Sequence, residues 1–192
     1  MIGAPSRILL SLAIVGLVQT SVLAYMVIDR VRLLASGRQI TLPVVPVDPR
    51  DLFRGEYARL GYDVGSVSLQ LLEGPRPRAN RAFYVVLEKM PDGNWQAVKM
   101  TRDLPQEPSS PDRIALKARS SYAWPQDGPR ETAVRVRYGI ESYFVPEGQA
   151  GKLEALARDK KLATLIAVDG KGNAAIKGIL VDGVLQYEEP FF

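Results

Sequence analysis

An uninterrupted apolar segment near the amino terminus places the first constraint on this chain. Residues 8–28 read ILLSLAIVGLVQTSVLAYMVI and contain no ionisable side chain except that of Tyr25. As an α-helix this segment would span about 31 Å, which matches the hydrocarbon thickness of a bilayer. No face of the helix would be polar, which argues against a helix packed in a soluble core. The segment therefore predicts a single transmembrane helix that contacts the lipid bilayer through residues 8–28.

A cleaved signal peptide is the competing interpretation. Its apolar region would be roughly 7 to 15 residues long and would lead into a small-x-small cleavage site. The best candidate for that site, Leu34-Ala35-Ser36-Gly37, lies beyond the charges of Asp29, Arg30 and Arg32. We therefore expect residues 1–30 to form an uncleaved membrane anchor and residues 31–192 to form one extracytoplasmic domain.

The flanking charges give only a weak indication of topology. Arg7 precedes the apolar segment, whereas Arg30, Arg32 and Arg38 follow it. Counted literally, this bias favours a cytoplasmic domain, but long domains cross membranes largely regardless of charge.

The composition removes several classes of function. The 192 residues include no histidine and no cysteine, which excludes serine–histidine triads, cysteine nucleophiles and zinc sites of the usual nitrogen and sulfur ligands. Neither a Walker-type loop nor a G-x-G-x-x-G motif between a strand and a helix is present. The net charge of +4 is mild, and basic residues are spread along the chain, so nucleic-acid binding has no support. We expect no cofactor and no metal.

Alternating apolar residues predict a mainly β domain (α+β class) of about eight strands. Pro43 and Pro46 remove backbone donors, so the first of these strands should lie at a sheet edge. One short soluble helix is expected over residues 149–161, with Leu153, Leu156 and Ala157 on its apolar face. Sequential hairpins indicate an antiparallel β-sandwich or a barrel-like domain. The expected strands and hairpins occupy residues 40–47, 67–72, 81–101, 113–119, 132–145, 162–169 and 173–187.

The stretch DPRDLFRGEYARLGYDV, at 48–64, concentrates ionisable side chains. Asp48-Pro49 predicts a turn, DLFR one turn of helix beginning near Asp51, and Gly55 the exit from that turn. EYARLGYDV then continues as a strand with Ala58, Leu60 and Tyr62 on the inward face and Tyr57 and Arg59 on the other.

The chemistry of this stretch is open to several interpretations. Carboxylates could supply an acid and a base or bind calcium, from Asp48, Asp51, Glu56 and Asp63. The interleaved Arg50, Arg54 and Arg59 favour simple ion pairing instead. A serine activated by a lysine is a further alternative, with Ser120 or Ser121 beside Lys117 or Lys99, although alternation points Lys117 toward water.

Within this stretch, RGEYARLGY at 54–62 resembles the signature of the bacterial GDYXXLXY family. Gly55, Tyr57, Leu60 and Tyr62 match the named positions, and Glu56 replaces the aspartate. PVDPRDLFRG (46–55) and YFVPEGQAGKLE (143–154) are also similar to this family. The resemblance implies an amino-terminal membrane segment, a domain that faces the periplasm and a gene neighbour that encodes a polytopic membrane protein. It implies no activity.

These observations predict a single-pass protein of the inner membrane that works by binding rather than by catalysis. We expect it to be an accessory subunit or partner of a polytopic inner-membrane protein. The alternative is an envelope hydrolase that uses serine–lysine or carboxylate chemistry. The residues expected to contact a partner, or to hold the fold together, are Asp48, Arg50, Asp51, Arg54, Gly55, Glu56, Tyr57, Arg59, Leu60 and Tyr62.

Overall fold

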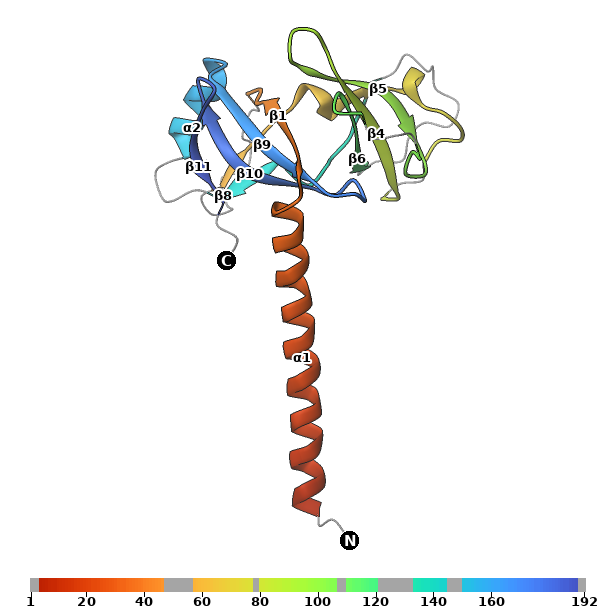
Figure 1. Cartoon of the computed structure of the whole chain (residues 1–192), viewed down its shortest axis with the longest axis vertical. Helices are drawn as coiled ribbons and strands as arrows, with labels where there is room; N and C mark the ends of the chain where they lie inside the picture. The colour runs from red at the N-terminus through yellow and green to blue at the C-terminus, as the bar shows by residue number, and fades with distance from the viewer. Residues whose placement is uncertain are drawn as a thin grey trace.

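A computed structural model shows one long helix projecting from a β-rich domain (Figure 1). The structure describes residues 4–46, 57–77, 80–106, 110–120, 133–144 and 150–189. The helices are α1 (Ala4–Leu34) and α2 (Ala150–Arg158), with short 3-10 helices η1 (Asp63–Gly65) and η2 (Leu69–Leu71). The strands are β1 (Arg38–Pro43), β2 (Tyr57–Arg59), β3 (Ser66–Ser68), β4 (Ala82–Lys89), β5 (Trp95–Thr101), β6 (Arg113–Arg119), β7 (Ala133–Arg135), β8 (Ser142–Phe144), β9 (Leu162–Val168), β10 (Ala174–Val181) and β11 (Val184–Glu188).

Helix α1 contains the predicted apolar segment and extends beyond it. Residues Ile8–Leu34 form a helix that is long and apolar enough to cross a membrane, and the domain buries none of its apolar window. At its carboxyl end, Leu34 is only 2% exposed. The helix therefore lies outside the domain along most of its length and joins the domain core at its last turn.

Four antiparallel sheets make up the domain, which confirms the predicted mainly β, antiparallel class. The "anchored sheet", which directly follows α1, has the order β1-β9-β10-β11, and the "three-stranded sheet" has the order β5-β4-β6. Two smaller sheets pair β2 with β8 and β3 with β7. No sheet closes into a barrel over the ranges that the structure describes.

Several local predictions are confirmed. Strand β1 lies at an edge of the anchored sheet, as its prolines predicted. Strands β4 and β5 form the predicted hairpin, in which Gly93 has a φ of +86°. The predicted helix and the final hairpin are present as α2 and as β10 paired with β11.

Two predicted strands were wrong in extent. Residues 67–72 form β3 followed by the 3-10 helix η2, because the Ser68 hydroxyl accepts a hydrogen bond from the Gln70 N–H and caps a helical turn. Residues 132–145 contain two short strands, β7 and β8, separated where Gly139 takes a φ of +87°. The described ranges hold eleven strands in place of about eight.

The anchored and three-stranded sheets share one hydrophobic core. Leu42 and Ile166 of the first belong to the same buried cluster as Phe83 and Leu116 of the second. The turn between β9 and β10 also bonds directly to β6, since the Lys117 N–H donates to the Gly172 carbonyl at 2.7 Å.

Gly172 is required at that contact for two reasons. Its φ is +77°, and a Cβ there would lie 2.9 Å from the Ala115 carbonyl oxygen. Any side chain would therefore be strained by the backbone conformation and would collide with β6.

Candidate functional site

The charged stretch at 48–64 is described only from Tyr57 onward. The predicted turn, the predicted helical turn and the exit glycine lie outside the described residues. The backbone of Tyr57 belongs to β2, and Arg59 is exposed, as predicted. The committed positions that lie outside the described ranges are Asp48, Arg50, Asp51, Arg54, Gly55 and Glu56.

Strand β2 places this stretch directly beside β8. Their register is Tyr57↔Phe144, Ala58↔Tyr143 and Arg59↔Ser142. The pairing continues beyond the strands, because the Leu60 N–H donates to the Glu141 carbonyl at 3.0 Å and the Val45 N–H donates to the Gly61 carbonyl at 2.9 Å. Residues 57–61 are thus held between two other segments of the domain.

The inward face of this strand follows the predicted alternation. Ala58, Leu60 and Tyr62 are 1%, 3% and 7% exposed. The Tyr62 hydroxyl donates to the Ile140 carbonyl at 3.1 Å and accepts from the Thr164 hydroxyl at 3.2 Å. One phenol therefore ties the motif strand to β9 and to the segment before β8.

Burial raises the pKa of the Tyr62 phenol well above its usual value, despite the opposing hydrogen bond from Thr164. The phenol is consequently neutral and serves as a fixed hydrogen-bond donor. Such a group supports a structural role, because a catalytic base would need a pKa near the working pH.

Tyr138 makes a second buried connection of the same kind. Its hydroxyl donates to the Val64 carbonyl at 2.6 Å, and burial raises its pKa well above the usual value. The Glu141 carboxylate accepts from the backbone N–H groups of Tyr138 and Gly139. This carboxylate, which the sequence analysis did not single out, fixes the bend between β7 and β8.

Three aromatic residues, two of them exposed, lie on β8 beside the motif strand and on β11. Phe144 on β8 is 83% exposed, and Tyr187 on β11 is 47% exposed. The Tyr187 ring meets the ring of buried Tyr143 edge to face, with centroids 6.0 Å apart. We call Tyr143, Phe144 and Tyr187 the aromatic edge. Sequence reasoning missed it, although alternation after Tyr143 would have placed Phe144 on the outward face.

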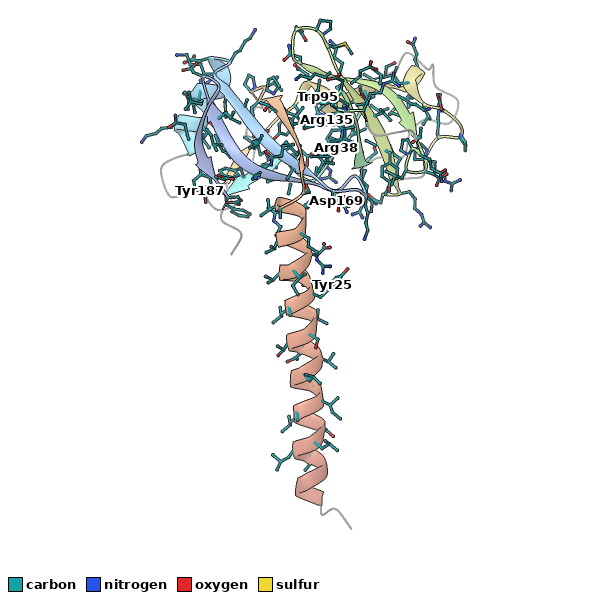
Figure 2. The ribbon with its side chains drawn as sticks, in the orientation of Figure 1. Tyr25, Arg38, Trp95, Arg135, Asp169 and Tyr187 are labelled. Atoms are coloured by element: carbon teal, nitrogen blue, oxygen red, sulfur yellow. The ribbon has the colours of Figure 1, made fainter. Side chains whose placement is uncertain are left out.

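The aromatic edge lies on the side of the domain from which α1 leaves. Figure 1 shows β8 and the C-terminal end of β11 near the level at which α1 enters the domain. Figure 2 places Tyr187 on this side, below the anchored sheet. The aromatic edge therefore lies on the same side of the domain as α1.

Comparison with known protein families identifies the family to which the chain belongs. A family model described as GDYXXLXY protein matches residues 19–179, from within α1 to β10. The chain belongs to the GDYXXLXY family. No curated protein and no solved structure matches it.

The structure gives a physical meaning to the described positions of the GDYXXLXY signature. Its leucine, Leu60, fills the core, and its last tyrosine, Tyr62, supplies the buried hydrogen bonds. Its first tyrosine, Tyr57, pairs with Phe144 of the aromatic edge through the backbone. Two of these positions therefore hold the fold, and a third adjoins exposed surface.

Most of the carboxylates that could form the predicted metal site of the GDYXXLXY domain lie outside the described residues. Asp63 is exposed at the start of η1, whereas Asp48, Asp51 and Glu56 lie outside the described ranges. Elsewhere in the described residues no group of three or more carboxylates could hold a metal ion. The carboxylate of Asp169 accepts from the N–H groups of Lys171 and Asn173, each at 2.8 Å, which confirms the predicted turn at 169–173.

The serine–lysine alternative receives no geometric support from the described residues. Ser120 is 6% exposed and continues the buried face of β6, whereas Lys117 lies on the opposite face of that strand. Lys99 forms an ion pair with Glu73 at 3.0 Å. Ser121 lies outside the described residues. The expected non-catalytic role stays a prediction.

Proposed function

We propose that this protein is a single-pass accessory subunit of the inner membrane, with its β domain in the periplasm and a polytopic membrane protein as its partner. The observation that carries the proposal is the contrast along α1. Large apolar side chains from Ile8 to Ile28 are 47% to 69% exposed, whereas Leu34 is 2% exposed. The first set needs an apolar environment that the domain does not provide, and the bilayer is that environment.

Packing around Leu34 favours an uncleaved anchor over a signal peptide. The candidate cleavage site begins at Leu34, which is buried in the domain core. Two residues later, the Ser36 hydroxyl donates to the Val168 carbonyl at 2.9 Å. A peptidase would have to pull this segment from the domain, and cleavage would remove part of the core.

The short connection sets the height of the domain above the membrane. Leu34 lies six positions beyond Ile28, which amounts to about 9 Å of helix. The aromatic edge is consequently held close to the bilayer surface, where the exposed part of a polytopic protein would meet it.

The chemistry of the aromatic edge supports a protein contact. Tyrosine and phenylalanine are enriched at the buried centres of protein interfaces, and arginine is also favoured there. Phe144 is exposed on the strand that pairs with the motif strand, Tyr187 is exposed on β11, and Arg59 of the motif strand is exposed as well. The periplasmic location rests on the likeness to the family, because the flanking charges favour neither side strongly.

Site-specific photocrosslinking in native membranes tests this proposal. A photoreactive phenylalanine analogue at Phe144 is expected to capture a multi-spanning membrane protein. The same analogue at Gln96, an exposed position of β5 in the three-stranded sheet, is the matched control and should give no such adduct. Equal labelling from both positions, or adducts with soluble proteins alone, would refute the accessory-subunit proposal.

A reporter fused to the carboxyl terminus tests the topology separately. Alkaline phosphatase is active only outside the cytoplasm, so the fusion should be active and should sediment with membranes. Activity in the soluble fraction would indicate a cleaved leader, and a silent phosphatase with a fluorescent cytoplasmic reporter would reverse the orientation.

A further inference from the structure

We propose that a basic pocket at the end of the three-stranded sheet binds a ligand that carries a phosphate group. The pocket has a volume of about 640 Å³, within the usual range for small-molecule sites. The loop before β4 and the end of β5 enclose it, through Pro75, Arg76, Pro77, Arg81, Ala82, Arg102 and Asp103. This inference is independent of the proposed membrane partner.

The charges in this pocket favour an anion. Three guanidinium groups face a single carboxylate, that of Asp103, so the lining carries two excess positive charges. Arg81 and Arg102 are both exposed, and within the part of the chain that the structure describes neither forms an ion pair. These two arginines can therefore bind a ligand without first breaking a salt bridge.

Phosphate matches this arrangement better than a single carboxylate. A phosphate monoester carries close to two negative charges at neutral pH, which balances the excess charge of the lining. The planar guanidinium fork also binds phosphate oxygens in pairs, through two parallel hydrogen bonds. Asp103 would repel the anion, so the exposed Arg81 and Arg102 supply the attraction.

The described parts of both pocket walls are conformationally restricted. Pro75 and Pro77 restrict the backbone of the first loop, and Pro77 is buried. On the other wall, the Thr101 hydroxyl donates to the Asp103 carbonyl at 2.7 Å and fixes the chain just after β5. Binding would therefore cost less conformational entropy than binding to a flexible loop.

The phosphate could belong to a soluble compound or to a lipid headgroup. The pocket lies at the end of the β4–β5 hairpin opposite its turn. Figure 1 shows that turn on the side of the domain remote from α1. The pocket is thus on the side from which the membrane helix leaves, so both sources are accessible and the experiment must separate them.

The test uses the full-length chain in phosphatidylcholine nanodiscs. Calorimetric titration with inorganic phosphate and with glycerol 3-phosphate measures soluble ligands. A second set of nanodiscs contains phosphatidic acid, whose headgroup is a phosphate monoester, and its enrichment around the protein is measured by mass spectrometry. The test variant combines Arg81→Ala with Arg102→Ala. The control is Arg135→Ala, which removes an exposed arginine of β7, and thermal unfolding verifies that each variant is folded.

Saturable binding of glycerol 3-phosphate, weakened about tenfold or more in the double variant and unchanged in Arg135→Ala, would support a soluble ligand. Phosphatidic acid enrichment that is lost in the double variant, without soluble binding, would support a headgroup. If the wild type binds neither, or if the double variant and the control behave alike, the inference is overturned. Should the double variant fail to fold, each single substitution is measured instead, and the same two outcomes apply.

Discussion

The anchored sheet and the three-stranded sheet differ in what they present to their surroundings. The first receives helix α1 at Leu34, and its strand β11 contributes Tyr187 to the aromatic edge. The second carries a basic pocket, and among the described residues none of its strands pairs with a strand of the first. A common core and the turn at Gly172 nevertheless join them. Two surfaces of different chemistry can thus be held at fixed positions without sharing a sheet.

The largest expected effect tests whether the sheets unfold together. Leu42→Ala in the anchored sheet and Leu116→Ala in the three-stranded sheet should each lower the free energy of unfolding by about 3 kcal/mol, because each truncates a fully buried leucine of the shared core. With one shared core, amide hydrogen exchange should accelerate in both sheets for either variant. Acceleration confined to the mutated sheet would show two independently stable units.

The second expected effect is a loss of stability at high pH. Tyr62 and Tyr138 stay protonated in the folded chain above pH 10, because burial raises the pKa of each, whereas they ionise in the unfolded chain. Their contribution to the free energy of unfolding is complete below pH 10. Above pH 10 it declines by about 1.4 kcal/mol per pH unit for each tyrosine. Denaturant titration of the full chain in micelles between pH 8 and pH 11 measures the slope. Tyr62→Phe should reduce this slope by the contribution of one titrating group. An unchanged slope would contradict the raised pKa of the buried Tyr62 phenol.

The third effect concerns the turn that connects the sheets. Gly172→Ala should cost about 2 kcal/mol or more, because positive φ strains the alanine and its Cβ meets β6. Gly93→Ala is the matched control, since its φ of +86° is similar but nothing lies within 4 Å of the added Cβ. That control should cost about 1 kcal/mol. Equal losses in denaturant titrations would mean that the contact between Gly172 and β6 does not hold the sheets together.

The smallest effect on stability is expected at the aromatic edge. Phe144→Ala should change the free energy of unfolding by no more than about 0.5 kcal/mol, because the side chain is 83% exposed. The same variant should abolish co-purification of the membrane partner. Co-purification at wild-type yield would show that Phe144 is not needed to bind the partner. A large loss of stability would show that Phe144 stabilises the folded domain instead.

Sequence reasoning succeeded where burial alternates residue by residue. Ile114, Leu116 and Ala118 of β6 and Ala58, Leu60 and Tyr62 of the motif are buried as predicted, because a strand places alternate side chains on one face. The apolar helix was equally evident, since no other fold satisfies so long an apolar run.

Other features depend on contacts that a linear pattern does not contain. Leu69 is buried both in the predicted strand and in the observed η2, so alternation could not distinguish the two, and the capping hydroxyl of Ser68 decided the outcome. The aromatic edge and the basic pocket each combine segments distant in the chain, such as β8 with β11 and residues 75–82 with 102–103. Only the folded arrangement brings these residues together.

The close junction between α1 and β1 has a mechanical consequence. Leu34 is buried in the domain, and β1 begins only four positions later, at Arg38. Rotation of α1 about its own axis must therefore rotate the β domain by the same angle. Each residue inserted into α1 before Leu34 would rotate the β domain by roughly 100° relative to the start of the helix. The number of residues in α1 therefore sets the direction in which the aromatic edge faces around the helix axis.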